Sequence, residues 1–208
     1  MKNIEIIESK NIIEYSYAIN FMENKVPQIK NNSCREIIWF LEHPSIYTSG
    51  RGNPIKKDKI NKIPIYNTSR GGKLTWHGPG QRIIYFVVNL KSRGFDIRRF
   101  VNNIEKFIIS SLTNLNIEAY KRENIVGIWT LDKEKKEAKI GSLGLRVSKG
   151  IIYHGLSLNV SCDLSNFYKI DPCGIKNSRV TSIKSLKNIA DNKIVDDVLK
   201  KNLNIIFS

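Results

Sequence analysis

Two residues of this 208-residue sequence have side chains that could act together in covalent catalysis. Lys139 lies near the start of the run AKIGSLGLRV, and Cys173 lies 34 positions later in the Pro-Gly turn DPCGI. A cysteine attacks as its thiolate, and only a few per cent of a free thiol is ionised at neutral pH. A neighbouring ammonium group stabilises the anion. The pair predicts a thiol nucleophile activated by a lysine, although spacing alone does not bring the two side chains together.

A glycine-rich segment in the first half of the sequence has the composition of a ligand-binding loop. The run SRGGKLTWHGPGQRIIYFVVNL, residues 69–90, carries four glycines within ten positions. Glycine lets the backbone approach a ligand closely and adopt positive φ values, and loops rich in Gly, His and Arg tend to be functional. The order GxxxxGK[ST] of a phosphate-binding loop is absent. A glycine-rich turn without a ligand is the alternative interpretation.

The other two cysteines and the three histidines give weaker indications of function than Lys139 and Cys173. Three cysteines, an odd number without a CxxC pair, argue against a disulfide framework. Three histidines without zinc-ligand spacing give no reason to expect a metal site. Cys162, at the end of an expected strand, is interpreted as structural, and no role is assigned to Cys34. His154 could be the base of a cysteine hydrolase, but spacing places no histidine beside Cys173.

These candidates must be positioned by a mixture of strands and helices. Hydrophobic periodicity predicts a helix over residues 12–29, ended by Pro27, and another over residues 96–116, capped by Asp96. Residues 53–64 are polar and indicate a surface loop. Apolar runs predict strands over residues 36–41, 83–90, 127–131, 138–147 and 151–160. A helical turn is expected over residues 163–167, and one or two helices after residue 181. We therefore predict an α+β (mixed α/β) fold on one sheet, in a single domain covering residues 1–208.

The charge and hydropathy of the sequence narrow its class. There are 34 basic and 19 acidic residues, a formal net charge of +15, which favours anionic partners. The basic residues are dispersed, so a coding bias explains the charge equally well. The N-terminus has no signal-peptide core and no stretch reaches the ~18 apolar residues of a membrane span. We expect a cytoplasmic protein without metal or other cofactor.

Five motifs, in this order, resemble the lipoyl(octanoyl) transferase family. They are EHPSIYTSGR, SRGGKLTWHGPGQRIIY, AKIGSLGLRV, YHGLSLNV and DPCGI followed by VTSI, and they extend from about residue 42 to residue 183. One departure is that Phe86 stands where the family usually has proline. The resemblance implies the mixed sheet flanked by helices that biotin and lipoate protein ligases share.

The resemblance also implies the reaction and its residues. An octanoyl group would move from acyl carrier protein to a lysine on the lipoyl domain of a 2-oxoacid dehydrogenase complex or of the glycine-cleavage H protein. Cys173 would be the acyl-thioester nucleophile, and Lys139 would lower the pKa of its thiol and accept a proton. Oxyanion donors would come from the turns at Gly72, Gly78 or Gly144. The implied substrate-binding residues are Arg70, Gly71, Gly72, Lys73, Leu74, Thr75, Trp76, His77, Ser142, Leu143, Gly144, Gly155, Leu156 and Ser157. Neither nucleic acid nor membrane is an expected partner.

Three alternatives stay open at this point. An ATP-dependent lipoate or biotin protein ligase on the same fold would need a nucleotide site and no nucleophilic cysteine. A basic nucleic-acid-binding module would show steep salt dependence, although no concentrated basic patch with interleaved aromatic residues supports it. A scaffold would bind acyl carrier protein on the same surface but would not catalyse acyl transfer.

Overall fold

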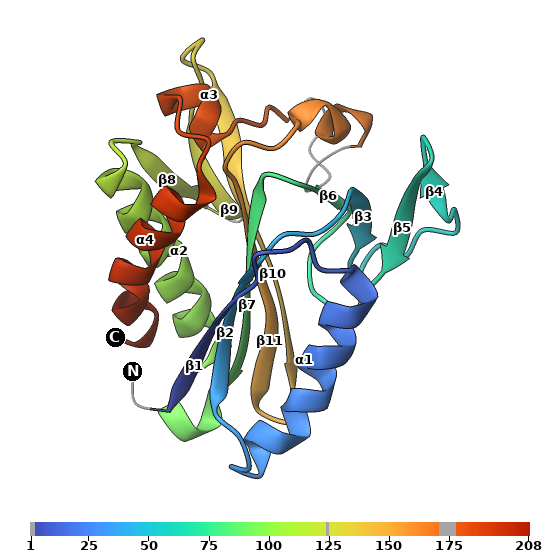
Figure 1. The fold of residues 1–208 in the computed structure, drawn as a ribbon, viewed down its shortest axis with the longest axis vertical. Helices are drawn as coiled ribbons and strands as arrows, with labels where there is room; N and C mark the ends of the chain where they lie inside the picture. The colour runs from blue at the N-terminus through green and yellow to red at the C-terminus, as the bar shows by residue number, and fades with distance from the viewer. Residues whose placement is uncertain (1–2, 124, 171–177) are drawn as a thin grey trace.

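A seven-stranded mixed sheet is the centre of the protein, which is described here by a computed structural model covering residues 3–123, 125–170 and 178–208 (Figure 1). Only β1 and β2 run parallel; the other neighbours are antiparallel. In spatial order the strands are β1 (Ile4–Glu8), β2 (Glu36–Leu41), β7 (Gln81–Asn89), β11 (Ile151–Asn159), β10 (Glu137–Ser148), β9 (Ile125–Leu131) and β8 (Ala119–Arg122). The predicted α+β (mixed α/β) fold is confirmed.

The central strands are apolar on both faces because each face is covered by helices. Alternate side chains of β7 serve two cores: Ile84, Phe86 and Val88 face one, and Ile83, Tyr85 and Val87 face the other. This alternation is the two-residue period of a strand.

Helices from distant parts of the chain cover the two faces. On one face lie α2 (Ile97–Asn114), α4 (Asn192–Asn202) and the short 3-10 helix η4 (Leu203–Phe207). On the other lies α1 (Tyr15–Lys30), whose Met22 packs in the same core as Trp39 (Figure 1). The side chain of Asp96 caps α2 as predicted, accepting from the Arg99 N–H at 2.7 Å. Three shorter elements are η1 (Lys91–Arg93), η2 (Leu164–Lys169) and α3 (Ile183–Lys187).

A second, four-stranded sheet lies beside α1 and was not predicted (Figure 1). Its order is β4 (Lys59–Ile60), β5 (Ile63–Asn67), β3 (Ile46–Ser49) and β6 (Thr75–His77). The strands have two to five residues, too few to show a clear period, and β4 and β5 include part of the expected surface loop. This small sheet holds the glycine-rich segment against the large one.

Two further expectations are corrected. Pro27 does not end the first helix but lies inside it, and α1 continues to Lys30. A proline in the last turn removes a single hydrogen bond, and the Pro27 carbonyl still accepts from the Asn31 N–H at 3.1 Å. The edge strands β1 and β8 were also missed, because edge strands are only half buried. Among the described residues, no helix combines the length and hydropathy needed to cross a membrane.

Candidate active site

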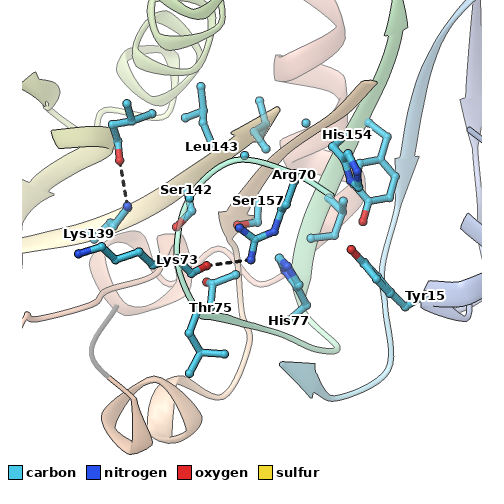
Figure 2. Close-up of a pocket in the computed structure, with 18 of the residues that line it drawn as sticks. Tyr15, Arg70, Lys73, Thr75, His77, Lys139, Ser142, Leu143, His154 and Ser157 are labelled. Carbon is cyan, nitrogen blue, oxygen red and sulfur yellow. Dashed lines mark hydrogen bonds between the residues drawn. The ribbon is translucent and has the colours of Figure 1, made fainter. Parts of the chain in front are cut away.

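A cavity of about 390 Å3 lies where the glycine-rich segment covers β7, β10 and β11 (Figure 2). Its size falls within the range of small-molecule sites. It is lined by Tyr15, Arg70, Gly72, Lys73, Leu74, Thr75, His77, Ile83, Tyr85, Ile125, Val126, Lys139, Ser142, Leu143, Gly144, His154, Gly155, Leu156 and Ser157. The walls are thus mainly aliphatic and aromatic, with polar groups gathered in a few places.

Most residues assigned from the sequence lie on this cavity. Lys139 and twelve of the fourteen expected substrate-binding residues line it; Gly71 and Trp76 do not. Trp76 is buried on the other side of β6, where its indole N–H donates to Ser45 Oγ at 2.9 Å and its ring packs against Phe167. Consecutive residues of a strand face opposite sides, so Trp76 points away when Thr75 and His77 point inward. Cys173 lies outside the described residues.

The side chain of Lys139 is buried at one end of the cavity. Its residue is 3% exposed, and Nζ donates to the Val126 carbonyl at 3.1 Å and lies 5.6 Å from the centre of the Trp129 ring. On the neighbouring strand β9, Gly127 leaves room for this side chain, since an added Cβ would lie 2.4 Å from Lys139 Cε and 2.6 Å from Nζ. Gly127 has φ +146°, which also favours glycine. The lysine therefore reaches the cavity because β9 has no side chain at this position.

The main chain of Lys139 is joined to the segment that follows Cys173 in sequence. Its N–H donates to the Arg179 carbonyl at 2.8 Å, and its carbonyl accepts from the Thr181 N–H at 3.0 Å. Arg179 is in turn paired with Asp132, with Arg179 Nη2 2.6 Å from the carboxylate. The first described residues beyond Cys173 are thus fixed beside the lysine.

Arg70 shapes the loop that covers the cavity. It is 8% exposed, and its guanidinium donates to the carbonyls of Gly71, Thr48 and Lys73 at 2.8, 2.6 and 3.0 Å (Figure 2). The loop packs closely on β10, since a Cβ on Gly144 would lie 2.9 Å from Arg70 Cδ. Arg70 therefore stabilises the conformation of the loop through these hydrogen bonds to backbone carbonyls.

A chain of buried hydrogen bonds runs from Arg70 toward Lys139. Arg70 Nη2 donates to Thr48 Oγ1 (2.7 Å), Thr48 Oγ1 donates to His77 Nε2 (3.1 Å), and His77 Nδ1 donates to Gln81 Oε1 (2.7 Å). Gln81 Nε2 then donates to Asn159 Oδ1 (2.9 Å), and Asn159 Nδ2 donates to the Thr181 carbonyl (3.0 Å), so every donor is directed toward Thr181. The amide oxygen of Gln81 can only accept, so His77 carries its proton on Nδ1 and accepts at Nε2. Thr181 then bonds to Lys139 through its own N–H.

The end of the cavity farthest from Lys139 is surrounded by aromatic rings. His43 donates from Nδ1 to the Ile13 carbonyl at 2.6 Å and accepts at Nε2 from the Tyr85 hydroxyl at 2.8 Å. Burial lowers the pKa of His43 to about 4 and that of His77 and His154 to about 3. Burial raises the pKa of Tyr15 to about 12. These groups are therefore neutral at pH 7.

Cys162 is buried at the end of β11, apart from the cavity lining. Its Sγ lies 3.7 Å from Asn159 Oδ1, and burial raises the pKa of its thiol to about 12. A thiol that stays protonated at neutral pH is a poor nucleophile, which agrees with the structural interpretation of Cys162. Cys34, partly buried, packs against the core beneath α1.

Sequence reasoning missed several lining residues. Tyr15, Ile125 and Val126 reach the cavity from α1 and β9 and lie outside the motifs, whereas Ile83 and Tyr85 lie at the end of the second motif but were given no role. The signal for Gly127 was visible as a glycine inside an apolar strand, which often marks a close approach. The signal for His154 was the interruption of the apolar run at His154-Gly155.

Comparison with known proteins agrees with this geometry. The family model of the lipoyl protein ligase A/B catalytic domain matches residues 14–203. An octanoyltransferase of Wolbachia sp. subsp. Brugia malayi (strain TRS) is 44% identical over 206 residues, covering 98% of this chain and 100% of the relative. Another octanoyltransferase, of Zymomonas mobilis subsp. mobilis, is 41% identical over 200 residues, covering 96% and 92%.

A solved structure of a lipoate-protein ligase A bound with ATP has a TM-score of 0.72 at 14% identity, covering 98% of this chain and 84% of that one. At that identity the likeness concerns the fold alone. The match to the family model and the near-complete coverage of the curated relatives are decisive: this chain belongs to the lipoyl protein ligase A/B catalytic-domain family, among its octanoyltransferases.

Proposed function

We propose that this protein transfers an octanoyl group from acyl carrier protein to a specific lysine of a lipoyl domain, through a thioester on Cys173. The observation that carries the proposal is the burial of the Lys139 ammonium group at the end of a mainly apolar cavity, with its main chain bonded to Arg179 and Thr181. A cation there serves an anionic sulfur, and the apolar walls suit a hydrocarbon chain. The names of the relatives at 44% and 41% identity support the same reaction.

The first half-reaction exchanges one thioester for another. Lys139 takes the proton of the Cys173 thiol, and the thiolate attacks the carbonyl carbon of the carrier-bound octanoyl group. The carbon–sulfur bond to the carrier breaks, and the carrier thiolate leaves with the proton from Lys139. The free energies of the two thioesters are similar, so the exchange needs no nucleotide.

The second half-reaction forms an amide. The neutral amine of the acceptor lysine attacks the Cys173 thioester, Lys139 accepts a proton from that amine, and the Cys173 thiolate leaves. The ammonium–thiolate pair is thereby restored. A covalent intermediate of this kind gives ping-pong kinetics. Of the candidate oxyanion donors, Gly72 and Gly144 line the cavity and Gly78 does not, which narrows the proposal to the first two.

The partners follow from this chemistry. The donor is octanoyl-acyl carrier protein, and the acceptors are the lipoyl domains of 2-oxoacid dehydrogenase complexes and the glycine-cleavage H protein. The net charge of +15 favours association with acidic partners. We expect the reaction in the cytoplasm, where a free thiol remains reduced.

Acyl trapping tests the proposal. The protein is incubated with octanoyl-acyl carrier protein without ATP, and intact-protein and peptide mass spectrometry follow. We expect one octanoyl group on the peptide containing Cys173 and its loss when a lipoyl domain is added. Cys162→Ala should acylate normally and Cys173→Ala should not. Octanoyl transfer that requires ATP and free octanoate would instead indicate a ligase, and a label on Cys162 would refute the assignment of Cys173.

A further inference from the structure

Trp129 is a buried tryptophan that lies directly opposite Lys139 in the large sheet. The two residues are register partners of β9 and β10, so their side chains leave the sheet on the same side. Lys139 Nζ lies 5.6 Å from the centre of the indole ring, within the ~6 Å at which an ammonium group is attracted to an aromatic face. Trp129 is 2% exposed and does not line the cavity. It therefore contacts the lysine without occupying the space in which a substrate would lie.

The sheet is irregular on both sides of Trp129. On one side the register between β9 and β10 shifts directly after Lys139. On the other side the register between β8 and β9 shifts after Tyr120, which is the partner of Trp129 on β8. Bulges of this kind change the direction of a side chain and are common beside functional sites. Next to these shifts two cations reach the ring: Lys139 Nζ, and Arg122, whose Cζ lies 4.9 Å from the ring centre.

The second cation beside the ring, Arg122, has a carboxylate partner. Arg122 Nη1 lies 2.9 Å from Glu137 Oε1, and the Tyr120 hydroxyl donates to Glu137 Oε2 at 3.1 Å. Glu137 thus holds the guanidinium and balances its charge. Arg122 therefore opposes the approach of the Lys139 ammonium group to the same ring only weakly.

Two further charged side chains near Lys139 come from other elements. Lys73 lines the cavity from the loop that covers it, at the same end as Lys139 (Figure 2). Lys73 is exposed, so solvent and salt screen its charge. Glu105 of α2 is buried and accepts from the N–H of Gly127. A test of Trp129 must leave these neighbours unchanged, and the variants below alter none of them.

The indole N–H of Trp129 is buried and has no hydrogen-bond partner within the described part of the chain. An unpaired buried donor is unfavourable, and a phenylalanine could fill a core position without that cost. The other two tryptophans differ, since Trp39 donates to Ser9 Oγ at 2.8 Å and Trp76 donates to Ser45 Oγ at 2.9 Å. Tryptophan has the aromatic face that attracts cations most strongly. The contact with the ammonium group gives a physical reason for a tryptophan at this position.

We propose that Trp129 is a positioning residue that holds the Lys139 ammonium group against its ring and so favours the state in which Cys173 is a thiolate. This inference rests on the proposed function, in which Lys139 and Cys173 share a proton. When the proton passes from Sγ to Nζ, the ring faces an ammonium group instead of a neutral amine, and the cation is the form that an aromatic face attracts. The ring therefore stabilises the ammonium–thiolate pair relative to the amine–thiol pair. It acts in the same way in the second half-reaction, when the lysine accepts the proton of the acceptor amine.

Alkylation of Cys173 over a range of pH tests the inference without any acyl donor. Iodoacetamide reacts with the thiolate, and peptide mass spectrometry after reaction between pH 5.5 and 10 gives the midpoint for this cysteine. Trp129→Leu removes the aromatic face and should raise the midpoint by about one pH unit, an about tenfold loss of thiolate below it. Trp129→Phe retains an aromatic face and should raise the midpoint by less. Trp39→Leu is the matched control: it also removes a buried tryptophan, 4% exposed in the core beneath α1, and should leave the midpoint unchanged.

Rates of acylation by octanoyl-acyl carrier protein provide a second readout. Because Trp129 lies outside the cavity lining, Trp129→Leu should lower kcat at pH 7 by about tenfold and leave KM nearly unchanged. The rate should recover in part as the pH rises, and Trp129→Phe should restore part of it at pH 7.

The indole N–H signal of Trp129 in nuclear magnetic resonance spectra provides a third readout, which needs no change at position 129. Trp39→Phe and Trp76→Phe identify the signals of the other two tryptophans by their loss. The remaining signal should shift with pH at the midpoint found by alkylation, because the charge of the pair beside the ring changes there.

The outcomes separate this inference from the proposed function. No thioester on Cys173 of the unmodified protein after incubation with octanoyl-acyl carrier protein would overturn the proposed function. Normal acylation together with an unchanged alkylation midpoint in a folded Trp129→Leu protein would overturn the role of Trp129 alone. An equal rise of the midpoint in Trp39→Leu would overturn it too, because any loss of a buried tryptophan would then have this effect. Where Trp129→Leu does not fold, a Trp129 signal that stays constant through the alkylation midpoint overturns the inference by itself.

Discussion

Lys139 and Val180 form an isolated parallel bridge that joins β10 to the described residues following Cys173. In the bridge the Lys139 N–H donates to the Arg179 carbonyl at 2.8 Å, and the Lys139 carbonyl accepts from the Thr181 N–H at 3.0 Å. Because the bonds are between backbone atoms, they do not depend on the identity of the side chain at position 139. The role of the Lys139 ammonium group can therefore be tested by substitution without removing the connection.

Replacing Lys139 by alanine should slow acylation at neutral pH by at least about tenfold and leave the fold intact. Without the cation, the pKa of the nucleophilic thiol returns toward the ordinary value of about 8.5, so less thiolate exists at pH 7. The rate should recover in part as the pH rises through 8 to 9. Initial rates of thioester formation from pH 6 to 9.5 measure this. Lys135→Ala, an exposed change in the adjacent hairpin, is the control; a defect independent of pH would mean that Lys139 positions substrate.

Replacing Gly127 by alanine should impair the same lysine from the neighbouring strand. The new Cβ would meet Lys139 Cε at 2.4 Å and Nζ at 2.6 Å, so the lysine must leave its position. With φ +146° at this residue, the backbone is also strained by about 1–3 kcal/mol. We expect thioester formation to fall more than tenfold, measured beside a melting curve. Gly52→Ala, with open space around it, should have normal activity; a normal rate in Gly127→Ala would show that Lys139 is not required in this place.

The fold was largely predictable from the sequence because its central strands and α2 carry long, strongly periodic apolar patterns. The strand expected over residues 151–160 corresponds to β11, and those expected over residues 127–131 and 138–147 correspond to β9 and β10. The edge strands and the small sheet escaped prediction because short, half-buried strands have weak periodicity. Pro27 misled the prediction because a proline near the end of a helix is tolerated better than one in its middle.

The site could be predicted only where motifs marked it. Lys139 and the Gly-rich segment were found from local sequence, and the structure places them on one cavity. Tyr15 lies at the start of α1, more than fifty residues before Arg70, so only tertiary packing brings the two to the same cavity. The left-handed backbone of His154 was equally invisible, since non-glycine residues rarely adopt it. The roles of Lys139 and Cys173 stay predictions that the experiments above decide.

The hydrogen-bond chain from Arg70 to Thr181 should behave as one unit. Gln81→Met leaves His77 Nδ1 and Asn159 Oδ1 without their partner, and Thr48→Val leaves His77 Nε2 without its donor. Each unpaired buried group should lower the free energy of unfolding by about 1–3 kcal/mol. In the double variant the two losses should not add, with a coupling of about 0.5–3 kcal/mol. Urea unfolding of the four proteins measures it, and additive losses would show that the bonds act independently.

Stability should fall steeply below pH 6.5 because three buried histidines are held neutral. Desolvation lowers the pKa of His43 to about 4 and that of His77 and His154 to about 3, from the ordinary histidine value of 6.5. As the pH falls below 6.5, the unfolded chain binds protons at these positions that the folded chain does not, so acid favours unfolding. Asp196 acts in the opposite direction, since desolvation raises its pKa to about 6 despite the ion pair with Arg82.

Between pH 5 and 6 the net effect is an uptake of about two protons on unfolding, a slope of about 3 kcal/mol per pH unit. The free energy of unfolding in urea at pH 5, 5.5, 6 and 7 measures the slope. His154→Asn should reduce the proton uptake on unfolding by about one, because it removes a histidine that binds a proton in the unfolded chain but not in the folded chain. Asp196→Asn should increase it by nearly one, because the opposing carboxyl is lost. A slope that neither substitution changes would mean that other groups control the acid sensitivity of the fold.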